Sequence, residues 1–143
     1  MAATRDNPRT PAPLTVQKLT PVLVVDAIEP CLSFWVDRLG FAKIVEVPEG
    51  NALGFVILVK DGIEVMYQSR ESVEHDVGDV VARSARSSTG LFIEVSDIDA
   101  IARATDGLEI VVPRRRTSYG MDEIGVREPG GSLVLFAQPA QSR

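Results

Sequence analysis

The chain has 143 residues, of which 45% are apolar and 24% are charged, and this composition is typical of one globular domain. Its formal net charge of −5 argues against nucleic acid as a partner and leaves room for a neutral or cationic small ligand. A single cysteine, Cys31, excludes an internal disulfide framework and a cysteine-rich zinc site. No run of about 20 apolar residues predicts a membrane span, so we expect a cytoplasmic protein that does not bind membranes.

The first 17 residues carry three prolines among small polar residues and no apolar core of signal-peptide type. Because proline interrupts both helices and strand pairing, we expect residues 1–17 to form a flexible tail. Residues 18–139 are expected to form a single domain.

The first half of this domain predicts four strands and one helix. Residues 20–25 are apolar and β-branched, which favours a strand that begins near Pro21. From residue 29 to 39 the period changes, because Leu32, Trp35 and Leu39 share one face of a helix that Gly40 ends. Further strands are predicted at 42–47, 54–59 and 63–68, with turns at 48–51 and 60–62.

The second half repeats this order after a polar linker at 71–89, in which we expect a helical turn around 77–83. A strand is predicted at 90–95 and a helix at 96–104, with Ser96 as N-cap and Gly107 at its end. The remaining strands are expected at 108–112, 123–127 and 133–137.

The two halves therefore predict one unit present twice. Residues 24–29 align with residues 94–99, seventy positions later, and Gly40 and Gly107 nearly keep that spacing. We expect an α+β fold of two βαβββ modules, at about 18–69 and 89–139, neither of which can bury a sheet alone.

Four motifs resemble the vicinal-oxygen-chelate superfamily, which includes glyoxalases, bleomycin-resistance proteins and extradiol dioxygenases. They are the helix signature at 33–41 (SFW…LGF), the strand-to-helix connection at 26–29 (DAIE), the start of the second module at 92–99 (FIEVSDID) and the last turn and strand of that module at 128–136 (EPGGSLVLF). The resemblance covers residues 19–138. It implies two modules whose curved mixed sheets enclose a cavity, and it implies a homodimer.

Metal-dependent members of the superfamily place one ligand on each of four strands. The resemblance carries these positions to Thr20, Glu64, Gly90 and Leu135, and a slip of one residue puts Leu19 or Pro21 in place of Thr20. Only Glu64 binds metals well, and one carboxylate is not a site for a transition ion. The single histidine, His75, lies in the linker. We therefore expect no bound metal and no cofactor.

Strand alternation predicts which side chains share the cavity face with these positions. Together with the glycine-containing loop at 118–121, it gives a set of ligand-binding candidates: Thr20, Glu64, Met66, Gln68, Phe92, Glu94, Tyr119, Met121, Glu123 and Leu135. Such a cavity would be mostly apolar with a few polar groups, as small-molecule sites commonly are.

Two interpretations stay open for several of these residues. Glu64 is either a general base or the holder of a cationic ligand, or else a carboxylate that pairs with a nearby arginine such as Arg127 or lies at a solvated cavity mouth. The basic run at 114–116 either binds an anion or is a solvated face. Trp35 is expected in the core, and Cys31 has no local partner that would activate it as a nucleophile.

The resemblance and the missing ligands together predict a metal-independent small-molecule-binding protein of the bleomycin-resistance type. Its ligand would be cationic or aromatic, sequestered by a homodimer. The alternative is an isomerase, lyase or dioxygenase of the same superfamily, with Glu64 as base and Tyr119 as acid or with an atypical metal site. A non-catalytic interaction module is a third interpretation, for which the sequence shows no heptad or peptide-groove pattern.

Overall fold

The computed structural model describes residues 14–15, 17–78 and 90–141. The first module contains β1 (Val22–Val25), α1 (Glu29–Leu32), η1 (Ser33–Arg38), β2 (Ala42–Glu49), β3 (Ala52–Lys60) and β4 (Ile63–Ser69), and α2 (Arg70–Val77) follows it. The second module contains β5 (Gly90–Glu94), α4 (Ile98–Ala104), β6 (Ile110–Arg116), β7 (Met121–Arg127) and β8 (Leu133–Pro139). None of the helices in the described ranges is long and apolar enough to cross a membrane.

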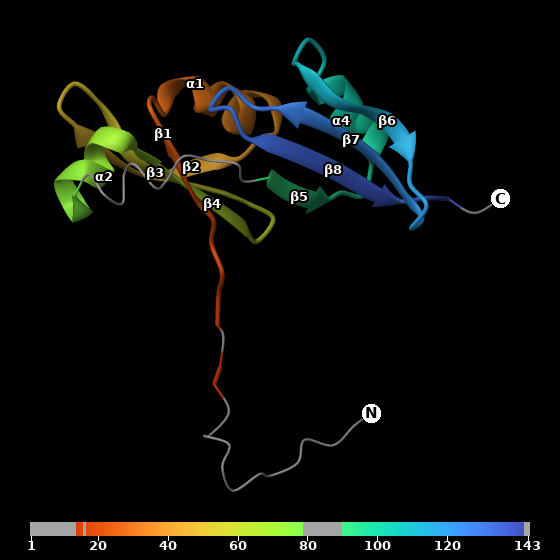
Figure 1. Cartoon of the computed structure of the whole chain (residues 1–143), viewed down its shortest axis with the longest axis horizontal. Helices are drawn as coiled ribbons and strands as arrows, with labels where there is room; N and C mark the ends of the chain where they lie inside the picture. The colour runs from red at the N-terminus through yellow and green to blue at the C-terminus, as the bar shows by residue number, and fades with distance from the viewer. Residues whose placement is uncertain (1–13, 16, 79–89, 142–143) are drawn as a thin grey trace, which may run out of the picture.

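The two modules have the same sheet topology. Their strand orders are β1-β4-β3-β2 and β5-β8-β7-β6. In each sheet the first strand runs parallel to the last strand of its module, and the other neighbours are antiparallel. The predicted α+β fold of two βαβββ modules is confirmed. Figure 1 shows the sheets next to each other, with α1 on one side and the described residues before β1 extending from the other.

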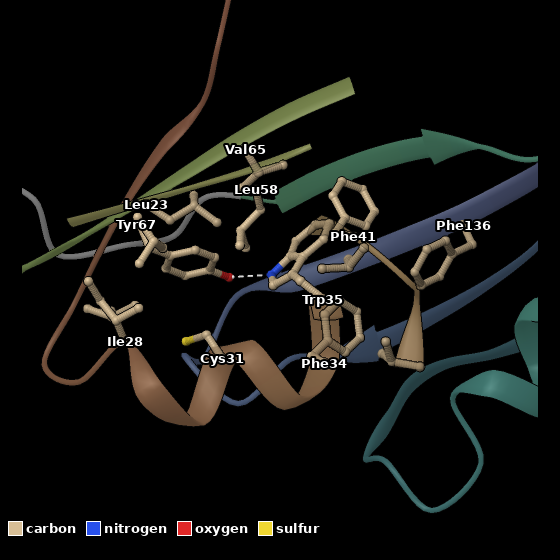
Figure 2. Packing of buried hydrophobic residues seen from close by; sticks show 14 of the residues in the cluster. Leu23, Ile28, Cys31, Phe34, Trp35, Phe41, Leu58, Val65, Tyr67 and Phe136 are labelled. Carbon is tan, nitrogen blue, oxygen red and sulfur yellow. Dashed lines mark hydrogen bonds between the residues drawn. The ribbon is translucent and has the colours of Figure 1, made fainter. Parts of the chain in front are cut away.

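One hydrophobic core joins both modules. β3 and β4 bury alternate residues, and in the second sheet β7 and β8 supply the buried side chains. The completely buried apolar side chains of the core are Ile28, Cys31, Phe34, Trp35, Val56, Leu58, Tyr67, Val126, Val134 and Ala137. Aromatic contacts cross the junction, since the rings of Phe34 and Phe136 lie 6.4 Å apart (Figure 2). Burying each large apolar side chain contributes roughly 1.5–3 kcal/mol, so separating the modules would be costly.

The helix of the first module differs from the prediction. It begins as α-helix at Glu29 but continues from Ser33 to Arg38 as a π-helix, in which the Leu39 N–H donates to the carbonyl of Phe34. Of the predicted face, Trp35 is completely buried but Leu32 and Leu39 are only half-buried, and Phe34, which lies outside that face, is completely buried. The physical reason is that this helix contacts both modules: Trp35 donates to Tyr67 of β4, and Phe34 packs against Phe136 of β8, so its apolar contacts are not confined to one stripe.

Local hydrogen bonds explain two further corrections. The expected linker begins with a helix, α2, because the Ser69 hydroxyl accepts from the N–H of Ser72 and caps it. Helix α4 is capped by Asp97 instead of Ser96, since the Asp97 carboxylate accepts from the N–H of Ala100. The helical turn expected around 77–83 lies mostly outside the described residues.

A buried hydrogen-bonded chain connects the modules through Tyr67. The Trp35 indole donates to the Tyr67 hydroxyl at 2.8 Å, and that hydroxyl donates to the Glu128 carboxylate at 2.7 Å. Glu128 also accepts from the backbone N–H groups of Gly130 and Ser132. Burial, followed by the charge of Glu128, raises the pKa of Tyr67 well above its ordinary value. The hydroxyl therefore stays protonated and remains a donor.

We expect Tyr67→Phe to lower the free energy of unfolding by about 1–3 kcal/mol, because it removes the acceptor of a buried indole and a donor to a buried carboxylate. Urea unfolding monitored by the fluorescence of Trp35 measures this change. Equal stability of Y67F and the unmodified protein would contradict the role given to Tyr67.

Candidate functional site

The face of the first sheet that points away from the core is largely apolar. Val22 pairs with Met66, and Met66 pairs with Ile57, so these three side chains form one row across the sheet. Val22 is 47% exposed, whereas the other two are half-buried. Glu64 and Gln68 alternate with buried residues of β4 and lie on the same face. We call this surface the first open face.

Glu64 brings a carboxylate to the first open face, and its side chain is 15% exposed. It forms an ion pair with Lys18, which lies in the segment before β1. The sequence left open a pairing with Arg127, but Arg127 lies 3.5 Å from Glu109 and also donates to the carbonyl of Gly131. The structural partner of Glu64 is therefore Lys18.

The corresponding face of the second sheet carries an aromatic side chain and a glycine that lies closely between two apolar side chains. Phe92, Leu135, Gly125 and Val112 form one row across the sheet. A Cβ atom on Gly125 would lie 2.9 Å from the Cβ of Val112 and 3.0 Å from a methyl carbon of Leu135, so only glycine lets these side chains approach each other. Phe92 is 54% exposed. We call this surface the second open face.

A completely buried carboxylate, Glu123, occupies the next row of the second open face. Arg115 donates to one carboxylate oxygen from Nε at 3.0 Å and from Nη2 at 2.7 Å. The Tyr119 hydroxyl donates to the other oxygen at 3.0 Å. The hydrogen bond with Glu123 raises the pKa of Arg115. The structure thus brings together two predicted candidates, Tyr119 and Glu123, and adds Arg115, which the prediction had not included.

The basic run at 114–116 is partly engaged by carboxylates of the same chain. Arg114 donates to Asp99 at 2.6 Å and to Asp122 at 3.0 Å, and it connects α4 with β6 and β7. Hydrogen bonding to Arg114 lowers the pKa of Asp122. The sequence contained a signal for these pairs. Asp122 follows Arg114 by eight residues and Glu123 follows Arg115 by eight, and the hairpin of β6 and β7 brings residues at this spacing close together. Binding of an external anion by this run stays a prediction.

The ten candidate residues fall into two groups, one on each sheet. The first sheet carries Thr20, just before β1, with Glu64, Met66 and Gln68, and the second carries Phe92, Glu94, Met121, Glu123 and Leu135, with Tyr119 in the turn before β7. Met121 pairs with Pro139 and is half-buried at the start of β7. The expectation that members of both groups line one cavity requires the two open faces to approach each other, and it stays a prediction.

The four positions implied for metal ligands do not fit a transition ion. Thr20 and Glu64 supply one hydroxyl and one carboxylate, while Gly90 and Leu135 supply no side-chain ligand. His75 lies in α2 and contacts the Glu49 carboxylate at 2.5 Å. Across the ranges that the structure describes, no group of three or more histidine, cysteine or acidic side chains gathers around one point.

Cys31 is completely buried in α1, beside the turn of the second module. Burial, followed by the charge of Glu128, raises the pKa of its thiol to about 12. A thiol with this pKa is not a nucleophile at neutral pH, as the sequence predicted from its lack of a local partner.

No protein-family model and no curated protein sequence matches the chain. Solved structures do match it. A glyoxalase/bleomycin resistance protein/dioxygenase from Nocardioides aligns with a TM-score of 0.68 and 15% identity, over 92% of this chain and 89% of that chain. A bleomycin-binding protein from Streptomyces verticillus, solved with copper(II)-bleomycin, aligns with a TM-score of 0.59 and 25% identity, over 90% and 99%.

A lactoylglutathione lyase from Agrobacterium tumefaciens also aligns, with a TM-score of 0.65 and 11% identity, over 87% of this chain and 94% of that chain. These similarities confirm the glyoxalase/bleomycin-resistance fold of the vicinal-oxygen-chelate superfamily, which binding proteins and enzymes share.

We expect Cys31 to resist thiol reagents in the folded protein. At pH 8 a thiol with a pKa of about 12 is ionised in about one molecule in ten thousand, and it is also shielded from solvent. Absorbance at 412 nm after addition of Ellman's reagent should show slow labelling without urea and one rapid equivalent in urea. Rapid stoichiometric labelling of the folded chain would show that the thiol is accessible and activated.

Proposed function

We propose that this chain, which has the fold of the vicinal-oxygen-chelate superfamily, is a metal-independent cytoplasmic protein that binds and sequesters a small cationic or aromatic molecule. The fold is shared with a protein solved in complex with copper(II)-bleomycin, at 25% identity. The ligand of this chain need not be bleomycin.

The observation that carries the proposal is the composition of the two open faces. Both present apolar side chains to solvent, among them Val22, Val47 and Phe92, each of which is 47–54% exposed. Exposed apolar surface of this kind commonly marks a binding site. At the positions where metal-dependent relatives hold their ion, the chain supplies one carboxylate, so these faces are suited to binding and not to metal-assisted chemistry.

The ion pair of Glu64 supports a cationic ligand. In the structure an ammonium group, that of Lys18, already contacts this carboxylate at the edge of an apolar face. Lys18 is 62% exposed and comes from the segment before β1, whereas Glu64 is 15% exposed and fixed in β4. A ligand ammonium with an apolar body could take the place of Lys18 and also contact Met66 and Ile57.

A homodimer is part of the proposal. Within one chain the open faces belong to different sheets, and the inner faces of both sheets are already used by the common core. A second copy related by a two-fold axis would place the first open face of one protomer against the second open face of its partner and would form two equivalent cavities.

Catalysis is the second candidate function. One observation favours it: the carboxylate of Glu64 is half-buried on an apolar face. A general base requires a carboxylate in such surroundings. The acid predicted to act with it, Tyr119, instead donates to Glu123 on the other sheet. An enzyme using both Glu64 and Tyr119 would therefore need the two open faces to meet.

We expect Glu64→Gln to weaken binding of a cationic aromatic ligand by about 1.5–3 kcal/mol, the range for hydrogen bonds to charged groups, which corresponds to about tenfold to a hundredfold in Kd. The ligand comes from a thermal-shift screen of bleomycin, with and without copper(II), and simpler aromatic amines. Calorimetry then gives Kd for E64Q and for Lys18→Met.

If Glu64 binds the ligand, K18M should bind as tightly as the unmodified protein or more tightly, because the competing ammonium is gone. If Glu64 only holds Lys18, then E64Q and K18M should lower the unfolding midpoint together and leave Kd unchanged. That second pattern would remove Glu64 from the site.

We also expect the protein to be a dimer at micromolar concentration, because a monomer leaves both apolar faces in water. Light scattering coupled to size exclusion should give about twice the chain mass of 15.5 kDa. Phe92→Lys, which places a charge in the second open face, should shift the mass toward the monomer, whereas Glu71→Lys on the exposed surface of α2 should not. A monomer at all concentrations tested would refute the dimer.

A further inference from the structure

The turn between β7 and β8 fills a hollow in the first module. Gly130, in this turn, lies so close to the first module that a Cβ atom on it would be 2.8 Å from Sγ of Cys31 and 2.8 Å from Cγ1 of Val25. The hollow is therefore bounded by the end of β1 and by α1, and the turn occupies it without leaving space.

The equivalent place in the second module is not filled. Seventy residues after Val25 and Cys31 come Val95 and Ile101, which follow β5 and lie in α4. The turn opposite them has only two residues, 61–62, between β3 and β4, whereas five separate β7 from β8. A cavity of about 500 Å³ remains there, and Figure 1 shows the β3–β4 turn next to β5. We call this space the junction cavity.

The junction cavity has an apolar interior formed by both modules. The first module contributes Leu39, Phe41 and Ile63, and the second contributes Ile101 and Phe136. Its volume falls within the range of about 300–1,000 Å³ that small-molecule sites occupy. Leu39, Phe41, Ile101 and Phe136 belong to the core or pack against it, whereas Ile63 is 51% exposed. These apolar side chains differ from those of the two open faces, and of the charged residues at the rim Glu94 borders the second open face.

The charged residues around the junction cavity are mainly acidic. Asp61, Glu94 and Asp97 bring three carboxylates, and Lys60 brings one ammonium, which lies 3.8 Å from Asp61. The Glu94 side chain is exposed at the end of β5, and no hydrogen bond or ion pair joins it to the parts of the chain that the structure describes. The field at this rim therefore favours a positive ligand group, in contrast to Glu64 and Glu123, which have cations of the chain beside them.

We infer that the junction cavity is a second binding site, which takes a small organic cation whose apolar body enters between the modules and whose ammonium group stays at the acidic rim. Because its walls come from both modules, an occupant bridges them and stabilises the folded chain by mass action.

Three probes with one aromatic body test the class of ligand: 1-naphthylmethylammonium, 1-naphthylmethanol and 1-naphthylacetate. Calorimetry and thermal unfolding of the full chain should show the ammonium binding about fivefold tighter than the alcohol, the upper range for partly exposed charge pairs, and the acetate binding weakest. The preference for the ammonium should decrease with added salt.

Ala100→Leu tests the location, because Ala100 lines the cavity and leucine would occupy part of its volume. This variant should weaken all three probes by at least about tenfold, since a filled cavity excludes the naphthyl ring. Ala102→Leu makes the same change in the same helix at a position that does not line the cavity, and it should leave binding unchanged.

Asp61→Asn combined with Asp97→Asn tests the charge with little risk to folding. Asn tolerates the positive φ of 52° at Asp61, and it also caps helices as well as Asp does at position 97. The double variant should abolish the preference for the ammonium over the alcohol. Glu71→Gln with Glu74→Gln, on α2, removes the same charge elsewhere and should preserve that preference.

Phe92→Ala separates this site from the one under the proposed function. If F92A loses the probes while A100L keeps them, the naphthyl ring binds an open face, which overturns the junction site and supports the proposed function. If A100L loses them while F92A keeps them, the junction site stands on its own. Equal binding of the three probes, or full binding by A100L, would overturn the inference.

Discussion

The hydrogen bond from Tyr67 to Glu128 sets the geometry on which the rest of the molecule depends. Glu128 is buried at the start of the β7–β8 turn, and its carboxylate is satisfied by Tyr67 and by two N–H groups of its own turn. A buried carboxylate that lost such donors would be strongly destabilising, so the turn must sit against the first module. Gly130 permits that approach, because any side chain there would meet Cys31 and Val25.

Once the modules are joined in this way, geometry determines which face of each sheet is covered. The inner faces are covered by α1, η1 and the opposite module, and they form one core. Within residues 14–15, 17–78 and 90–141, no layer of the chain covers these outer side chains enough to bury them, and yet they include Val22, Met66 and Phe92. An apolar outer face costs stability in water, which is why these faces are better explained by a ligand or a second copy than by folding alone.

The sequence predicts the local elements well and the long-range contacts poorly. Period-two alternation identified the strands, and the repeat at seventy residues identified the two modules, because both follow from side-chain spacing along the chain. The π-helical segment was missed, since its register depends on packing against two sheets. The pairing of Lys18 with Glu64 joins residues 46 positions apart, and no local pattern indicates it. The pairing of Arg115 with Glu123 was visible in the hairpin spacing, but a run of three arginines looked like a solvated face.

Charge distinguishes the open faces from the junction cavity more sharply than shape does. At Glu64 the chain supplies Lys18, and at Glu123 it supplies Arg115 and the Tyr119 hydroxyl, so a cationic ligand at either position must compete with a group that is covalently tethered nearby. Competition of this kind favours ligands with a large apolar body. The ligand only replaces an ion pair that the chain already has, so most of its affinity must come from buried apolar area. At the junction cavity Lys60 pairs with Asp61 and the Asp97 carboxylate caps α4, whereas the Glu94 carboxylate has no cation beside it in the part of the chain that the structure describes. A ligand cation inferred at this rim would therefore add a charge pair with Glu94 without displacing Lys60. The two kinds of site should therefore differ in their response to ionic strength: binding by exchange changes little with salt, whereas binding that adds a charge pair weakens as salt screens it.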